Sequence, residues 1–431
     1  MILNFGDTGS LVEALQLALI RSGYLSGAPD GIFGEKTREA LFRFQTSYGL
    51  TADGIAGEKT FAQLERYLRG YYKKEVRKGD TLWNIASDNG ISIKQLLTAN
   101  PGIDADNLSV GNTLTVPYSF DVVPTDISYS YYLTKLIIEG LKARYPFIKT
   151  SVTGYSATGK TIDDITIGNG KNEIFINSGF HANEWLNIPV VLKFTEEFLY
   201  SLINEKAIEN IRPSEIINEV TIKTIPLVNP DGLDLVTGAL NEGAIFEKAK
   251  KIADDYPFVP FPSGWKANIN GVDLNLQFPA MWEKAKEIKF KQGFISPSPI
   301  EFVGTAPLTE KEARIIYEYT LNNNFRLILA YHSQGSIIYW KYTDFLPPDS
   351  LRIGEELSAA SGYPLSITPP DSSYAGYKDW FIENYNRPGY TIETGIGTNP
   401  LPVSQFDTIY SENRRLISAA LKETSLLQNS D

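Results

Sequence analysis

Two histidines and two glutamates are the residues whose types and spacing favour chemistry. The sequence contains only two histidines, His181 and His332, and each follows a short apolar run that we predict to be a buried strand. Glu184 lies three residues after His181, and Glu393 follows a third such run at 389–392. In an open α/β sheet, ligands collect beyond the carboxyl ends of the strands. Three strand ends can therefore bring two imidazoles and two carboxylates to one place.

This set of residues suits a catalytic zinc ion. Hydrolytic zinc commonly takes two histidines and one glutamate and keeps a fourth position for water, whose pKa it lowers towards about 7. His181 and Glu184 could reach one ion from a single turn, and His332 would complete the set from a distant strand. Glu393 suits the role of proton acceptor, because burial raises the pKa of a carboxyl. The plainer alternative is that His181 and His332 are ordinary core or turn residues.

The sequences around these residues resemble the zinc carboxypeptidase family of metallopeptidases, of the carboxypeptidase A type. The resemblance covers residues 125–425 and consists of blocks in the family's order, at 179–185, 226–232, 265–268, 271–275, 331–333, 379–380 and 391–395. It implies that His181, Glu184 and His332 bind one zinc ion per chain and that Glu393 is the general base. It also implies a catalytic domain of α/β class, with a mixed sheet between layers of helices.

Departures from the family pattern bear on the substrate. Leu276 stands where exopeptidases of the family have an arginine that grips the terminal carboxylate, which argues against ordinary C-terminal trimming. Lys266 stands where the family has an arginine that polarises the scissile carbonyl, and a lysine can do this as a point charge. Asn275 could donate to a polar substrate group, and Lys378 would favour a negative group on the leaving side. Tyr374 is the nearest match to the family's mobile tyrosine.

Residues 1–70 precede this domain and contain an internal sequence repeat. The sequence Asp-Gly-Ile-Phe-Gly-Glu-Lys-Thr at 30–37 recurs as Asp-Gly-Ile-Ala-Gly-Glu-Lys-Thr at 53–60, and each Asp-Gly turn is followed by apolar residues at helical spacing. A capping box at 10–13 predicts an earlier helix. The pattern predicts a three-helix domain, and it resembles peptidoglycan-binding domains.

Residues 73–117 form a second small module. Their pattern predicts strand, helix, helix and strand, and they resemble a LysM module, which binds glycan strands. We expect a linker at 118–126 and the catalytic domain at 125–425. The segment 154–161 satisfies the letter pattern of a P-loop, but the β-branched residues after it predict a strand rather than the helix that a phosphate site needs.

Composition limits which binding partners and which cellular locations we expect. The net charge of −11 argues against nucleic-acid binding, and the absence of cysteine excludes disulfides and thiolate metal sites. No apolar run approaches the length of a membrane span, and the first residues lack the features of a signal peptide. We therefore expect no membrane partner, a monomer, and a location in the bacterial cytoplasm or in the spore or cell wall.

Two wall modules beside an intact catalytic set favour an enzyme that hydrolyses peptidoglycan stem peptides while its modules hold glycan strands, because binding modules raise the local substrate concentration. The domain order resembles the γ-D-glutamyl-meso-diaminopimelate endopeptidases of sporulating bacilli, which implies cleavage of the γ-D-glutamyl–diamino acid bond. The alternatives are a zinc carboxypeptidase that trims ordinary polypeptides and a non-catalytic wall-binding protein.

Overall fold

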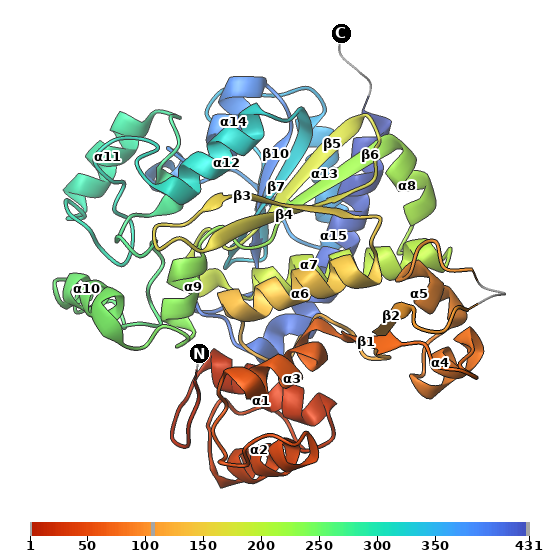
Figure 1. The fold of residues 1–431 in the computed structure, drawn as a ribbon. Helices are drawn as coiled ribbons and strands as arrows, with labels where there is room; N and C mark the ends of the chain where they lie inside the picture. The colour runs from red at the N-terminus through yellow and green to blue at the C-terminus, as the bar shows by residue number, and fades with distance from the viewer. Residues whose placement is uncertain (1, 105–107, 428–431) are drawn as a thin grey trace. The chain divides into compact units, whose positions relative to one another are not determined.

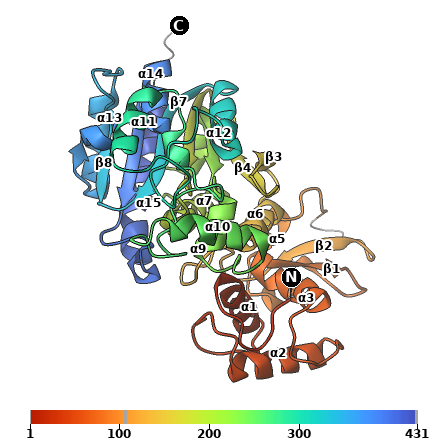
Figure 2. The same cartoon turned by 90° about the vertical axis from the view of Figure 1, so that its left-hand side faces the viewer.

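The computed structural model describes residues 2–104 and 108–427. The chain divides into two compact units, Met1–Lys149 and Thr150–Asp431 (Figures 1 and 2). The first unit contains the two small modules, and the second contains a large sheet with helices on both faces.

The first module is a bundle of α1 (Ser10–Arg21), α2 (Glu35–Ser47) and α3 (Glu58–Arg69). A buried glutamine beside each copy explains the internal sequence repeat. Gln16 donates to Asp30 Oδ1 at 2.7 Å and accepts from the backbone of the first Asp-Gly turn, and Gln45 does the same at the second turn, with 2.9 Å to Asp53 Oδ1. Because a buried amide needs all its partners, each turn is held closed by one side chain.

The predicted capping box at the start of α1 is wrong. Gly9 is the N-cap, with φ 105°, and no side chain caps the helix there. Ser10 is buried within the first turn, and the Glu13 carboxylate instead accepts from the backbone N–H of Ser128. Glu13, which the local pattern assigned to the helix cap, therefore forms a tertiary hydrogen bond instead.

The second module has the predicted strand–helix–helix–strand order: β1 (Tyr71–Glu75), α4 (Leu82–Asp88), α5 (Ile93–Thr98) and β2 (Thr113–Pro117). The two strands pair antiparallel, with Tyr71 opposite Pro117. Its core is small and apolar and includes Leu82, Ile85 and Leu96.

The segment after β2 is packed against the modules by α6 (Tyr131–Arg144). The Arg144 guanidinium donates to the backbone carbonyls of Gly70, Tyr118 and Phe120 at 2.6–3.1 Å. Gly140 lets the helix approach closely, because a Cβ there would lie 2.1 Å from the carbonyl oxygen of Arg69. The segment expected as a linker is thus ordered by hydrogen bonds, and the three-domain division stays a prediction.

The second unit is built on an eight-stranded sheet in the order β3-β4-β6-β5-β7-β10-β8-β9. The strands are β3 (Lys149–Tyr155), β4 (Thr161–Ile167), β5 (Asn172–Asn177), β6 (Val220–Ile225), β7 (Phe325–Ser333), β8 (Ile337–Tyr339), β9 (Leu365–Ser366) and β10 (Gly389–Thr394). The central pairs β6–β5, β5–β7 and β7–β10 are parallel, whereas β4–β6 and β10–β8 are antiparallel. The sheet is therefore mixed, and the P-loop-like segment is a turn between two strands.

Helices cover both faces of this sheet because successive residues of its strands point to opposite sides. Phe175 of β5 packs in one buried cluster with Phe381 of α14, and Ile176 lies beside Phe198 of α7 and Ile417 of α15. The helices of this unit are α7 (Asn187–Ile203), α8 (Pro213–Glu219), α9 (Pro230–Val236), α10 (Gly243–Asp254), α11 (Trp282–Lys291), α12 (Lys311–Leu321), α13 (Ser350–Ser361), α14 (Tyr377–Tyr385) and α15 (Phe406–Leu426). The predicted mixed-sheet α/β/α architecture is confirmed.

Candidate metal centre

The predicted chemical residues meet at the carboxyl ends of three neighbouring strands. His181 follows β5, and Glu184 ends the short 3-10 helix η1 (Ala182–Glu184) directly after it. His332 lies at the end of β7, and Glu393 is its partner in the parallel pairing with β10. Strand order alone therefore places the four side chains at one edge of the sheet.

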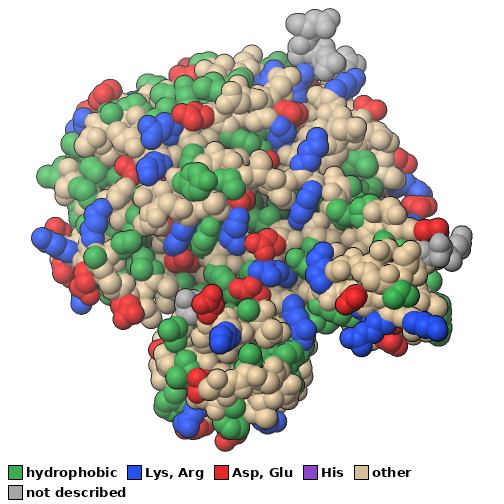
Figure 3. All heavy atoms as spheres, in the orientation of Figure 1, with side chains coloured by type: hydrophobic (Ala, Val, Ile, Leu, Met, Phe, Trp, Pro, Cys, Tyr) green, Lys and Arg blue, Asp and Glu red, His purple; other side chains and the backbone are tan. Residues whose placement is uncertain are grey.

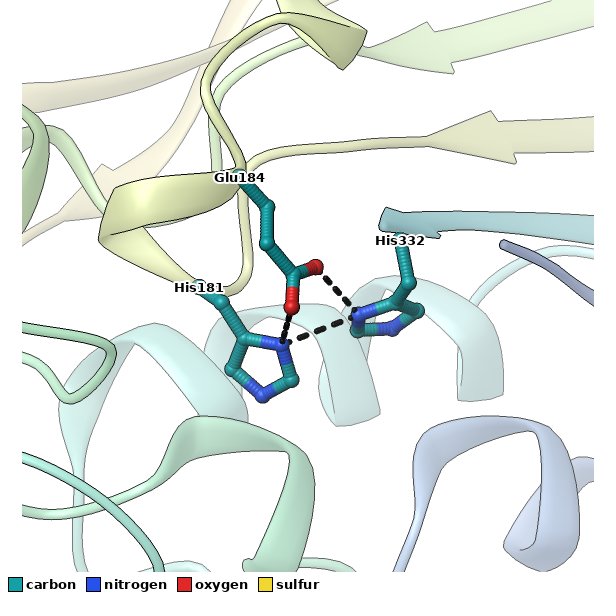
Figure 4. A group of neighbouring side chains, drawn as sticks. All are labelled: His181, Glu184 and His332. Atoms are coloured by element: carbon teal, nitrogen blue, oxygen red, sulfur yellow. Dashed lines mark hydrogen bonds and ion pairs between the residues drawn. The ribbon is translucent and has the colours of Figure 1, made fainter. Parts of the chain in front are cut away.

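The ligand atoms of three of these residues converge on one point (Figure 4). His181 Nδ1 lies 2.9 Å from Glu184 Oε1, His332 Nδ1 lies 3.0 Å from Glu184 Oε2, and the two Nδ1 atoms are 3.0 Å apart. All three side chains are buried. Two imidazole nitrogens and a carboxylate that face one another this closely suit a small cation, whose bonds to such atoms are about 2.0–2.2 Å long.

Further contacts hold the three side chains in place. His181 Nε2 lies 3.0 Å from Asp273 Oδ1, and that oxygen also accepts from the backbone of Asn275. The backbone N–H of Ser333 donates to Glu184 Oε2 at 3.1 Å. A carboxylate on the far ring nitrogen orients an imidazole for metal binding. The sequence pattern contained Asp273 in its 271–275 block but assigned it no role.

The cavity around this centre has a volume of about 390 Å³ and an unbalanced charge. Its lining carboxylates are those of Glu184, Asp273, Glu301, Asp379 and Glu393, and its lining ammonium groups are those of Lys266, Lys289 and Lys378. With neutral imidazoles and every carboxylate ionised, as a nearby cation favours, five carboxylates against three ammonium groups give a formal charge of −2. A divalent cation neutralises this excess, so the residues fit a zinc ion in charge as well as in geometry.

The protonation states also fit metal binding, which needs neutral imidazole and ionised carboxylate. Burial lowers the pKa of His332, which keeps its ring neutral. Burial would raise the pKa of Glu184, but the charge of His181 and hydrogen bonds from both imidazoles lower it well below its usual range. Burial opposes protonation of His181, yet Glu184 and Asp273 raise its pKa to about 9, so a metal ion must displace a proton there.

Glu393 differs from the carboxylates that surround the two imidazoles. Burial and the negative charge of Glu184 raise its pKa to about 8, against the opposing charges of Lys266 and His181. The side chain is half-buried and lines the cavity. A carboxyl whose pKa lies near neutrality can both take and return a proton during a reaction.

Lys266 is placed as a fixed positive charge beside the centre. Its Nζ lies 3.7 Å from Glu301 Oε1 and 4.0 Å from Asp273 Oδ2. Burial would lower the pKa of this ammonium, but the carboxylates of Glu301 and Asp273 raise it above its ordinary value. The side chain lines the cavity and stays charged at neutral pH.

Three of the four predicted substrate residues line the same cavity. Asn275 accepts from the backbone of Tyr377 at 3.0 Å, which orients its amide group. Leu276 is 8% exposed and packs in an apolar cluster with α11. The Lys378 ammonium lies 2.7 Å from Asp379 Oδ1 and 2.8 Å from the carbonyl oxygen of Lys341, so its charge is already partly balanced.

Tyr374, the fourth, is not among the residues that line the cavity. Its ring packs under the Lys284 ammonium, 4.3 Å from the ring centre, and against the cluster around Leu276. Its role as the mobile tyrosine stays a prediction. The lining includes Tyr339, Lys289 and Glu301, which sequence reasoning missed because none belongs to a recognisable motif.

Comparison with known families agrees with this fold and centre. Residues 135–416 match the zinc carboxypeptidase family, residues 8–64 match the peptidoglycan binding domain, and residues 75–117 match the LysM domain. The chain therefore belongs to the zinc carboxypeptidase family and is a zinc metallopeptidase with peptidoglycan-binding modules.

Two bacterial relatives share much of the chain. The gamma-D-glutamyl-L-diamino acid endopeptidase 1 of Lysinibacillus sphaericus is 42% identical, over 68% of this chain and 72% of the relative. The uncharacterised protein YqgT of Bacillus subtilis is 37% identical, over 64% of this chain and 73% of the relative.

Solved structures agree with the fold. Bovine thrombin-activatable fibrinolysis inhibitor, solved in complex with tick carboxypeptidase inhibitor, matches with a TM-score of 0.54 and 18% identity, over 70% of this chain and 98% of that one. Carboxypeptidase A of Helicoverpa armigera matches with a TM-score of 0.51 and 17% identity, over 91% and 87% of the two chains. At these identities the likeness supports the fold alone.

The helices and the surface bear on the expected partners. Within the described ranges, no helix combines the length and apolar character that crossing a membrane requires. On the face drawn in Figure 3, Lys and Arg side chains are interspersed with Asp and Glu side chains.

Proposed function

We propose that this protein is an endopeptidase that cleaves the γ-D-glutamyl–diamino acid bond of peptidoglycan stem peptides. The relative from Lysinibacillus sphaericus, whose name states this specificity, supports the proposal, as do the two wall-binding modules. Leu276 carries it furthest, because it puts a buried, apolar side chain at the position where exopeptidases hold a terminal carboxylate.

The reaction follows from the positions of the side chains. His181, Glu184 and His332 would hold the zinc ion. When bound, zinc supplies a water of lowered pKa and polarises the scissile carbonyl. Glu393 takes the proton of the attacking water and returns it to the leaving amine. Lys266 offers a positive charge to the carbonyl oxygen as negative charge develops there.

The remaining residues position the reactants. Asp273 fixes the ring of His181, so that its Nδ1 points to the centre. Asn275 and Lys378 line the cavity, where Asn275 would donate to a polar substrate group and Lys378 would favour a negative group on the leaving side. The peptidoglycan binding domain and the LysM module hold glycan strands and raise the concentration of stem peptides near the cavity.

The remaining expectations stay predictions. We expect a monomer without nucleic-acid or membrane partners, acting in the bacterial cytoplasm or in the spore or cell wall. A role in sporulation is likewise a prediction.

The test is digestion of muropeptides of known structure by the zinc-loaded protein, with the products identified by mass spectrometry. We expect one fragment that ends in D-glutamate and a second that begins with the free amine of the diamino acid. Release of single C-terminal residues would instead favour the ordinary carboxypeptidase. Intact muropeptides with one zinc ion bound per chain would favour the non-catalytic wall-binding protein.

A further inference from the structure

Lys289 is a charged residue that the proposed mechanism does not use. It lies in the last turns of α11, its side chain is only 6% exposed, and it lines the cavity of the metal centre. The other lysines of this helix are placed differently; Lys291, for example, is 72% exposed. Burial of an ammonium group is costly unless it is paired, so this position needs a physical reason.

The partner of Lys289 is Glu301, which it shares with Lys266. Lys289 Nζ lies 2.5 Å from Glu301 Oε2, and Lys266 Nζ lies 3.7 Å from Glu301 Oε1. Among the described residues, Glu301 is the one hydrogen-bonding or ionic partner of the Lys289 side chain. An ammonium group has three donors, so it can bind a second anion without releasing the first.

The backbone holds this pair of cations firmly. Glu301 has φ 64°, a left-handed conformation that is uncommon for residues other than glycine and that clusters at functional sites. Its segment is fixed on both sides: Pro299 O accepts from the backbones of Lys266 and Ala267 at 2.9 Å, and Phe302 O accepts from Asp273 at 2.8 Å. Two ammonium groups therefore flank one carboxylate at a preorganised edge of the cavity.

A γ-linked glutamyl residue has a free α-carboxylate, which a positively charged edge of the cavity could bind. When a glutamyl residue is linked through its side-chain carboxyl, its α-carboxyl takes no part in that amide and carries a negative charge. Leu276 offers no charge to it, but Leu276 packs with Ala285, which lies one helical turn before Lys289 on α11. The helix that covers Leu276 thus brings a cation into the cavity.

We propose that Lys289 binds the α-carboxylate of the γ-D-glutamyl residue on the acyl side of the scissile bond, and so makes the enzyme specific for γ-linked substrates. The acyl side is assigned because Lys266, which the proposed mechanism sets against the scissile carbonyl, is joined to Lys289 through Glu301. This inference rests on the proposed function and names the residue that reads its substrate.

The experiment compares two matched tripeptides with the full-length, zinc-loaded protein. One is L-Ala-γ-D-Glu-L-Lys, and the other carries an amide in place of the D-glutamyl α-carboxylate. We expect the wild-type protein to prefer the carboxylate in kcat/KM by about 10- to 100-fold, the range of one hydrogen bond to a charged group. Lys289→Met should lower kcat/KM for the carboxylate substrate by that factor and leave the amide substrate nearly unchanged.

Two further variants separate binding from folding. Lys289→Met combined with Glu301→Gln removes both charges of the ion pair and avoids an unpaired carboxylate, and it should show the same loss of preference. Lys291→Gln, an exposed lysine on the same helix, should leave the preference unchanged. Lys289→Arg should keep part of it.

The outcomes distinguish failure of the inference from failure of the proposed function. Equal losses on both substrates in the Lys289 variants would show a structural role and overturn the inference. A third tripeptide carries meso-diaminopimelate in place of L-Lys. If the effect of Lys289→Met on kcat/KM depends on this replacement and not on the D-glutamyl α-carboxylate, Lys289 lies on the leaving side and the inference is overturned. If the wild-type protein cuts neither tripeptide at the γ-bond, the proposed function fails and the inference fails with it.

Discussion

Replacement of Glu393 by glutamine tests the chemistry with the least change in shape. Glutamine fills the same volume but cannot accept the proton of the attacking water. Removal of a general base typically lowers a rate by about 10²- to 10⁴-fold, which is about 3–5 kcal/mol of transition-state stabilisation. We expect kcat of Glu393→Gln to fall by such a factor while one zinc ion per chain stays bound, because the metal ligands are unchanged.

The same substitution should stabilise the metal-free protein. The pKa of Glu393 rises from an ordinary 4.5 to about 8 through burial and the charge of Glu184. Between these values the unfolded chain is ionised while the native state keeps its proton, so stability falls as pH rises through this window. From pH 4.5 to pH 7 the window spans two and a half pH units, which at about 1.4 kcal/mol each give about 3.5 kcal/mol. This is an upper limit, because the carboxyl faces the cavity.

The assays are peptide hydrolysis, zinc content and thermal unfolding of the chelator-treated protein as a function of pH. The metal-free variant should melt above the metal-free wild type at pH 7, and the two should converge below about pH 4.5. Glu197→Gln is the matched control for turnover and zinc content, because Glu197 lies on α7 and is not part of the cavity lining. Turnover within about threefold of wild type, with zinc bound, would refute the assignment of Glu393 as the base.

Three further predictions test other parts of the site. Leu276→Arg should create release of C-terminal residues from ordinary peptides, at least about tenfold above the wild-type level and measured by mass spectrometry, because a guanidinium can hold the terminal carboxylate; no such release would remove Leu276 as the basis of specificity. Asp273→Asn should weaken zinc affinity by about 10- to 100-fold in a chelator competition, since the His181 ring loses its carboxylate partner; unchanged affinity would contradict that role. Burial opposes ionisation of Glu197, but Arg414 and Tyr410 lower its pKa, so its contribution is present above pH 4.5 and is lost as pH falls through the lower folded value. Glu197→Gln should therefore cost up to about 1 kcal/mol at pH 7 and nothing in strong acid, as urea unfolding would show, and a cost independent of pH would count against the ion pair.

The centre was predictable because its residues are rare and follow strands. His181, His332 and Glu393 each follow an apolar run, and strand order brings such ends together without any need to know side-chain contacts. The mixed sheet followed from the resemblance to the family, and it is borne out by the parallel pairs β5–β7 and β7–β10 together with the antiparallel pairs β4–β6 and β10–β8.

The residues that escaped prediction depend on packing rather than on pattern. Lys289 lies among several lysines of α11, and only the fold shows which of them points into the cavity. Glu301 lies in an irregular segment whose position is fixed by backbone bonds to residues 266, 267 and 273. The capping box failed for a similar reason, because Glu13 meets a backbone more than a hundred residues away.

The hydrogen bonds between α6 and the segments that follow the two modules bear on how the protein attaches to the cell wall. The match to the zinc carboxypeptidase family begins at residue 135, inside the helix whose Arg144 holds three carbonyls of the preceding segments. With a flexible linker between modules and enzyme, the effective concentration of substrate near the active site would depend on the length of that linker. Here hydrogen bonds from Arg144 tie the segments that follow the two modules to that helix, so a substitution at Arg144 should alter wall attachment without any change in the length of the chain.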